Sequence, residues 1–74
     1  MDSLPKHSVL LFGHATSVTL EPEFWDELKA IAARKGTSLN KLIEGIDAAR
    51  DTNLSSALRV FVLGELKNEL EKQS

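Results

Sequence analysis

The segment at residues 15–20 constrains the fold of this chain more than any other part of the sequence. Its side chains are small or β-branched, and apolar and polar positions alternate, which is typical of a strand. An isolated strand would leave its backbone N–H and C=O groups without partners. Either residues 9–12 fold back on it through a turn at Gly13 and His14, or the same strand of a second chain pairs with it. We expect pairing between two chains, because the first arm of a hairpin would be only about four residues long, which is short for a strand.

The size of the chain favours association as well. Its 74 residues form one small domain, and a domain of this size buries only about 60% of the surface that its unfolded chain exposes. Such domains usually gain stability from disulfides, a metal or a partner chain. The chain has no cysteine, which excludes disulfides and thiolate zinc sites. A second copy of the chain is the stabilising partner that remains.

Three amphipathic helices are predicted after the strand. Pro22 suits the first position of a helix, and Gly36 suits a left-handed end. Ser38 and Asn53 are predicted N-caps of the second and third helices. Gly45 inside the second helix indicates a close approach of another helix. The expected organisation is a flexible lead-in at 1–8 and a single domain at 9–71, with a strand at 15–20 and helices at 22–35, 38–50 and 54–71.

The charge pattern and the motifs exclude several classes of function. The net charge is −2, without a basic or acidic tail, and the longest apolar runs are far too short to span a membrane. Residues 1–22 lack the apolar run of a signal peptide, so we expect a cytoplasmic protein. No phosphate-binding loop, nucleophile motif or metal-ligand spacing is present, so we expect neither an enzyme nor a metal or other cofactor. His14 is interpreted as a turn residue and Trp25 as a core residue, in preference to a pH switch and a base-stacking platform.

Two segments resemble the ribbon-helix-helix domain of bacterial and phage repressors: residues 16–28 (TSVTLEPEFWDEL) and residues 36–43 (GTSLNKLI). The stretch at 13–63, which includes NLSSALRVFVL at 53–63, resembles more specifically a three-helix subgroup. This subgroup consists of predicted DNA-binding proteins common in alphaproteobacteria. The resemblance implies a mainly α fold with one short strand, in which two chains form an antiparallel β-ribbon and a third helix extends the domain.

The resemblance also implies a function and a set of site residues. Such proteins are homodimeric transcriptional regulators that insert the ribbon into the major groove of DNA. Carried over by position, the base-facing residues are Ala15, Ser17 and Thr19. The phosphate clamp is Thr37, Ser38, Leu39, Asn40 and Lys41, at the start of the second helix. Auxiliary positive charge comes from Lys6, His14, Arg34 and Lys35. The dimer core is Val18, Leu20, Phe24, Trp25, Leu28, Leu42, Ile43, Ile46 and Phe61.

Two other functions remain open at this point. Ribbon readers usually carry long polar side chains such as Arg or Gln where this chain has Ala15, Ser17 and Thr19. Together with the acidic net charge, this favours as an alternative a protein-interaction or oligomerisation module that has lost DNA binding. An antitoxin is a third possibility, since this fold often carries toxin-neutralising tails.

Overall fold

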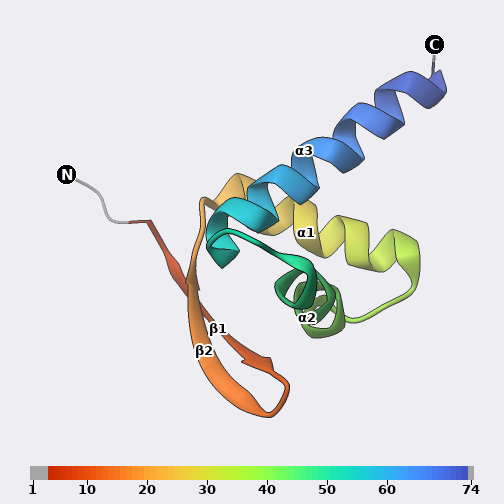
Figure 1. Cartoon of the computed structure of the whole chain (residues 1–74). Coiled ribbons are helices and arrows are strands. Elements are labelled where there is room, and N and C mark those ends of the chain that lie inside the picture. Colours follow the sequence, from red (N-terminus) through yellow and green to blue (C-terminus); the bar gives the residue numbers. More distant parts are fainter. Residues whose placement is uncertain (1–3, 74) are drawn as a thin grey trace.

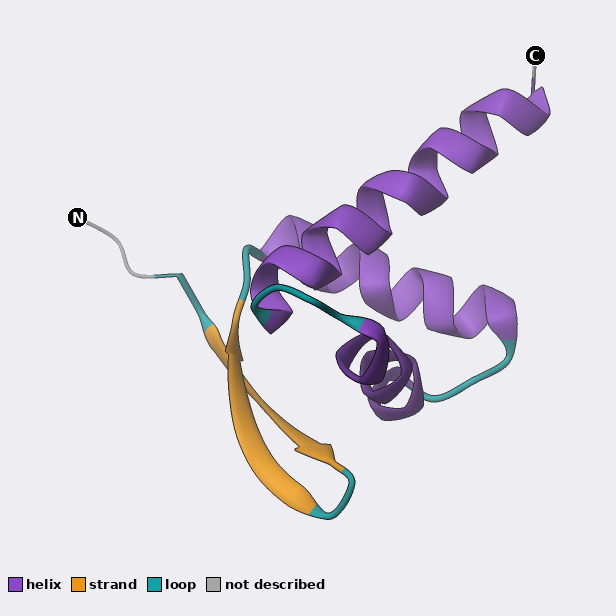
Figure 2. Cartoon of the chain, viewed as in Figure 1, coloured by secondary structure: helices purple, strands orange, loops and turns teal. Residues whose placement is uncertain are grey.

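The computed structural model describes residues 4–73, with side chains through residue 72. Two strands precede three helices: β1 (Lys6–Leu11), β2 (His14–Thr19), α1 (Pro22–Lys35), α2 (Leu39–Ala49) and α3 (Leu54–Gln73) (Figures 1 and 2). The helices begin and end within two residues of the positions expected from the sequence.

The strands form an antiparallel hairpin within one chain, with Leu11 opposite His14 and Lys6 opposite Thr19. The two-residue turn between them is made by Phe12 (φ 52°) and Gly13 (φ 82°), both in the left-handed region that a tight hairpin turn requires. The expectation that the strand at 15–20 lacks a neighbour in its own chain was therefore wrong. So was a flexible lead-in that includes residues 6–8, because these residues lengthen β1 to six residues. Residues 1–3 of that lead-in lie outside the described part of the chain.

The helix ends follow from local capping. Gly36, with φ 69°, ends α1, and its N–H donates to the carbonyls of Ala32 and Ala33. The hydroxyl of Ser38 accepts a hydrogen bond from the Lys41 N–H at 3.1 Å, which caps α2. The side chain of Asn53 accepts one from the Ser56 N–H at 2.8 Å, which caps α3.

The core lies within a single chain, between one face of the hairpin and the three helices. Its fully buried side chains include Leu20, Leu28, Ile31, Ile43 and Leu58, each with an exposed fraction of 0%. Of the residues expected to form a dimer core, Val18, Leu20, Leu28 and Ile43 are buried here, and Phe24, Trp25, Leu42, Ile46 and Phe61 are half-buried against them. These side chains stabilise one chain, because β1 supplies Val9 and Leu11 where a partner was expected.

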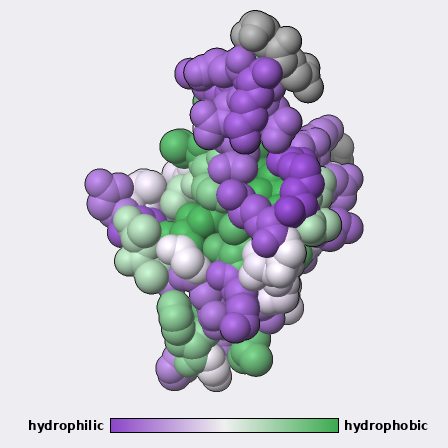
Figure 3. All heavy atoms as spheres, turned by 90° about the vertical axis from the view of Figure 1, so that its right-hand side faces the viewer, coloured by the Kyte–Doolittle hydropathy of each residue, from purple (hydrophilic) through white to green (hydrophobic). Residues whose placement is uncertain are grey.

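The third helix is apolar on two opposite sides. Leu58 and Val62 are buried in the core, whereas Val60, Leu63 and Leu70 are between 55% and 68% exposed. The second half of α3 extends beyond the other elements (Figure 1). Figure 3 shows hydrophobic residues gathered in the middle of the side of the molecule that lies to the right in Figure 1. A single chain thus leaves apolar surface uncovered.

Candidate nucleic-acid interface

The outward face of the hairpin brings the three predicted base-facing residues together. The register places Ala15, Ser17 and Thr19 opposite Leu10, Ser8 and Lys6, respectively, and side chains directly opposite each other share a face. Five of these six residues are exposed, and Thr19 is half-buried. The sequence has no acidic residue between positions 3 and 20, so Lys6 is the one formal charge on this face. The face is small, mixed in polarity because Leu10 and Ala15 are apolar, and slightly positive.

The inner face of β2 is only partly covered. Val18 and Leu20 are buried as expected, but Thr16, which alternation along the strand places on the same side as them, is exposed. A hollow of about 320 Å³ lies beside it, lined by Leu11, His14, Thr16, Ser17, Asp47, Arg50 and Leu54. Thr16 is uncovered because α2 packs against β1 and α3 meets β2 near its end, so no helix reaches the middle of β2.

One edge of β2 carries unpaired peptide groups. The N–H of Leu20 donates to the carbonyl of Pro5 at 3.2 Å, which continues the ladder of the hairpin. Given the register, the peptide groups of even-numbered β2 residues point to β1, and those of Ala15, Ser17 and Thr19 point away from it. The carbonyl of Thr19 accepts a hydrogen bond at 2.8 Å from the hydroxyl of Ser55, in the first turn of α3. The open edge therefore consists of the peptide groups of Ala15 and Ser17 and the N–H of Thr19.

At the start of α2, two backbone N–H groups of the predicted phosphate clamp already have partners within the chain. The N–H of Thr37 donates to the Ala32 carbonyl at 3.0 Å, and the N–H of Lys41 donates to Ser38. Among the described residues, the N–H groups of Ser38, Leu39 and Asn40 have no acceptor. The side chains of Asn40 and Lys41 are exposed beside them. Three backbone donors and one cation are thus available to an anion here.

The predicted auxiliary cations fall into two groups. Lys6 and His14 are exposed on the hairpin. Arg34 and Lys35 instead form ion pairs with α3, Arg34 with Glu69 at 4.0 Å and Lys35 with Glu65 at 3.7 Å. Their charges are partly neutralised, and they tie the end of α1 to α3.

His7, which lies on β1, packs against α1 and is not part of the outward face of the hairpin. The ring of His7 stacks on Trp25, with centroids 3.8 Å apart and planes 7° from parallel. Its Nε2 is buried without a hydrogen-bond partner in the described part of the chain. This stack attaches β1 to α1.

Sequence reasoning missed two ion pairs that hold the connections between elements. Arg59 of α3 donates to Glu21, just before α1, at 2.8 Å, and this hydrogen bond lowers the pKa of the Glu21 carboxyl. Arg50 donates to Asp47 at 2.6 Å and to the carbonyl of Thr52 at 2.6 Å. The pair between Arg59 and Glu21 joins residues 38 positions apart and leaves no signal in the local sequence pattern.

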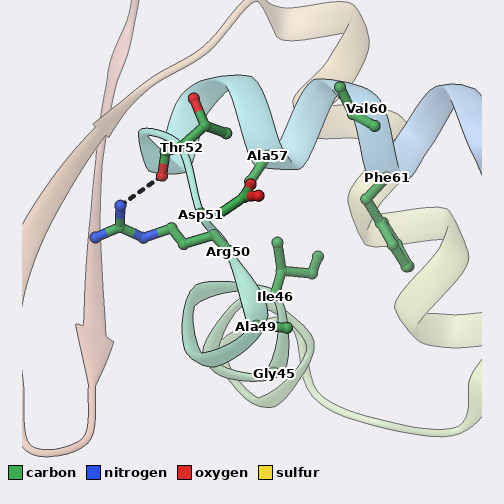
Figure 4. Close-up of a pocket in the computed structure, with 9 residues that line it drawn as sticks. All are labelled: Gly45, Ile46, Ala49, Arg50, Asp51, Thr52, Ala57, Val60 and Phe61. Carbon is green, nitrogen blue, oxygen red and sulfur yellow. Dashed lines mark hydrogen bonds between the residues drawn. The ribbon is translucent and has the colours of Figure 1, made fainter.

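A second concave surface lies between α2 and α3. This cleft has a volume of about 510 Å³ and is lined by Gly45, Ile46, Ala49, Arg50, Asp51, Thr52, Ala57, Val60 and Phe61 (Figure 4). Gly45 was expected to allow a close approach of another helix. A Cβ atom placed on it would meet nothing within 4 Å, so that expectation was wrong within this chain. The apolar residues that line this cleft add to the uncovered apolar surface between α2 and α3.

Neither a metal-ion site nor a membrane-spanning helix is found among the described residues. Among residues 4–73, no group of three or more histidine and acidic side chains lies close enough together to hold a metal ion. Within the same residues, no helix combines the length and apolar character needed to cross a membrane.

Comparison with known proteins agrees with this geometry. A model of the ribbon-helix-helix domain matches residues 4–66, a range that includes β1 and most of α3. The chain belongs to the ribbon-helix-helix domain family. It is also similar to the solved structure of an uncharacterized protein from Bordetella pertussis Tohama I, with 37% identity and a TM-score of 0.78. The similarity covers 97% of this ribbon-helix-helix chain but 62% of the Bordetella chain. No match was found among curated proteins.

Proposed function

We propose that this ribbon-helix-helix protein is a homodimeric transcriptional regulator that contacts duplex DNA with the outward face of its hairpins. The observation that carries the proposal is the composition of that face. It combines Lys6 with serine and threonine side chains, Ala15 and Leu10, and contains no carboxylate, although the chain as a whole carries a net charge of −2. Ribbon-helix-helix domains typically dimerise and bind DNA, which supports the same assignment.

No acidic residue belongs to the outward face itself, although Glu44 accepts a hydrogen bond from the Phe12 N–H at the tip of the hairpin and Asp47 lines the hollow beside Ser17. Glu65 and Glu69 are paired with cations of α1, and Glu21 and Asp47 are paired with arginines. These four residues lie in or next to the helices, after the end of β2. The local field at the hairpin is therefore more favourable to a phosphate backbone than the net charge indicates.

The width of the sheet determines how such a dimer contacts DNA. Four strands about 4.8 Å apart span about 14 Å, whereas the major groove is about 12 Å wide and admits two strands. If β2 strands lie at the centre, their Ala15 and Ser17 side chains face the base edges. The outer β1 strands then meet the rims of the groove, where Lys6 approaches phosphates. Short central side chains and rim lysines favour affinity over sequence discrimination.

Fluorescence anisotropy with labelled duplexes at several salt concentrations tests this proposal. We expect saturable binding that weakens as salt rises, because phosphate contacts release counterions. Lys6→Ala removes one cation from each chain and should lower the slope of log K against log salt by about 0.9 for each phosphate that is no longer neutralised. Lys29→Ala is the matched control, because Lys29 is an exposed α1 cation that is paired with Asp26. Absence of saturable binding, or binding without a salt dependence, would refute the proposal.

A protein-interaction module is the second candidate, and one observation favours it. Leu10 is 53% exposed on the outward face, and Phe12 is 61% exposed at the tip of the hairpin. Where exposed apolar side chains form a contiguous patch, the surface is typical of one that binds proteins. In the anisotropy experiment, this candidate predicts no DNA binding by the wild type. It also predicts that Leu10→Ser abolishes capture of a specific protein partner, with Leu63→Ser on α3 as the control.

A further inference from the structure

One end of the outward face of the hairpin is apolar. In the register of the strands, Leu10 lies directly opposite Ala15, so their side chains are neighbours on this face. Leu10 is 53% exposed, and Phe12, in the turn that follows, is 61% exposed. Lys6 lies at the opposite end of β1. We call Leu10, Phe12 and Ala15 the apolar end of the hairpin.

The apolar end is not part of the core of the chain. The inward neighbours Val9 and Leu11 are each 6% exposed and belong to the hydrophobic core, whereas Leu10 and Phe12 do not. Phe12 also adopts φ 52°, which is unfavourable for a residue with a side chain. Strained backbone conformations of this kind cluster at binding sites and other functional sites. Exposure and strain together indicate that these side chains contact a ligand.

The rest of the outward face has little capacity to distinguish bases by hydrogen bonds. Its polar residues besides Lys6 are Ser8, Ser17 and Thr19, and each side chain offers a single hydroxyl. A hydroxyl bonds to donors and acceptors alike, whereas strong discrimination comes from the bidentate contacts of Arg, Asn or Gln. The face lacks these residue types. A sequence preference therefore has to come from apolar contact.

Thymine carries the apolar group that fits this end of the hairpin. Its C5-methyl group projects into the major groove, where apolar side chains contact it. The methyl group lies at the side of the base pair, close to the backbone of its own strand, and the outer position of β1 in the proposed dimer brings Leu10 near it. We infer that the apolar end contacts thymine methyl groups, which gives the protein a preference for duplexes with thymine at these positions. This inference rests on the DNA binding of the proposed function and names the feature of the bases that is read.

Charge and size favour DNA over a protein as the partner of the apolar end. The outward face carries Lys6 and no carboxylate, which suits a phosphate backbone. A specific protein interface buries about 800 Å² on each partner, more than three apolar side chains supply, whereas contact with a methyl group needs only one. The Glu44 carboxylate accepts a hydrogen bond from the Phe12 N–H at 2.8 Å, and this attaches the tip to α2. The apolar end is therefore held in place before it meets a ligand.

Replacement of thymine by deoxyuridine removes only the methyl group and tests the inference directly. The probes are a labelled duplex of alternating A and T, the same duplex with deoxyuridine for thymine, and a duplex of alternating G and C with and without 5-methylcytosine. Fluorescence anisotropy at one low salt concentration measures the affinity of the whole chain for each. We expect the wild type to bind the thymine duplex about fourfold more tightly for each methyl group contacted, the factor that burial of one such group provides. 5-Methylcytosine should strengthen binding by a similar factor, because its methyl group occupies the same place in the groove.

Three variants show whether the apolar end reads the methyl group. Leu10→Ser should bring the ratio of the affinities for the thymine and deoxyuridine duplexes towards one, whereas Leu10→Val keeps an apolar side chain and should retain most of the ratio. Lys6→Ala is the matched control from the same face, and it should weaken binding to both duplexes alike. Positions 6 and 10 are exposed, so each variant should fold, and circular dichroism checks this.

The outcomes separate methyl recognition from DNA binding itself. Equal affinity of the wild type for the thymine and deoxyuridine duplexes, with binding that still weakens as salt rises, would overturn methyl recognition and leave the proposed function in place. A thymine preference that persists in Leu10→Ser would show that the methyl group acts elsewhere on the protein or through the shape of the DNA, and would also overturn it. Absence of binding to every duplex would refute the proposed function and the inference together.

Discussion

The hairpin turn contains a backbone conformation that can be tested quantitatively. Phe12 adopts φ 52°, and its N–H donates to the Glu44 carboxylate at 2.8 Å. A left-handed conformation costs about 1–2 kcal/mol for a residue with a side chain, and asparagine tolerates it better than most. The ring of Phe12 is 61% exposed. Its burial therefore contributes well under the 1.5–3 kcal/mol of a fully buried side chain, or about 1 kcal/mol.

Two substitutions separate these contributions. Phe12→Ala removes the ring and keeps the unfavourable conformation, so we expect a loss of about 1 kcal/mol in the free energy of unfolding. Phe12→Asn also removes the ring but relieves about 1 kcal/mol of backbone strain, so we expect it to be near neutral. Both variants keep the N–H that donates to Glu44. The difference of about 1 kcal/mol corresponds to about 4–8 °C in melting temperature for a domain of this size.

Thermal and urea unfolding followed by far-UV circular dichroism measures the difference. Equal stabilities of the Asn and Ala variants would show that the left-handed turn carries no strain and would refute the reasoning. A large loss in both variants would show that the ring contributes more than its exposure indicates. Glu44→Gln is a useful companion, because it keeps an acceptor for the Phe12 N–H and removes the charge.

Three further predictions concern the rest of the chain. Leu58 is fully buried, so Leu58→Ala should lower the free energy of unfolding by about 2–5 kcal/mol, measured by urea titration. A loss below about 1 kcal/mol would contradict the place of Leu58 in the core. Because the Arg59 hydrogen bond lowers the pKa of Glu21 below 4.5, it stabilises the fold fully above that pH and progressively less as the pH falls through the lowered pKa. Arg59→Met should flatten this acid dependence, and an unchanged dependence in urea titrations at several pH values would contradict the pairing. Finally, the single tryptophan, Trp25, stacks on the ring of His7, so His7→Ala should change the fluorescence emission of Trp25, and an unchanged emission spectrum would contradict the stack.

The helices could be predicted from the sequence because their signals are local. Ser38, Asn53 and Gly36 act within four residues of their own positions, as the cap hydrogen bonds show. The outward face of β2 could be predicted for the same reason, since alternation along a strand does not depend on what the strand pairs with.

The hairpin and the environment of β2 could not be predicted in this way. Two-residue turns favour Asn-Gly or Asp-Gly, and the Phe12-Gly13 pair does not match this sequence signal. The exposure of Thr16 depends on where α2 and α3 lie relative to β2, which no local pattern encodes. The ion pair between Glu21 and Arg59 is likewise set by the packing of α1 against α3.

The intrachain hairpin also changes the relation between folding and assembly. Where the only strand pairing is between chains, folding and association are one bimolecular reaction, and dilution unfolds the protein. Here β2 pairs first with the strand directly before it, and the core closes within the same chain. Strand pairing and closure of the core within one chain allow folding to precede association. In the dimer that we propose, dilution would then lower the amount of dimer, and with it DNA binding, without unfolding the chain.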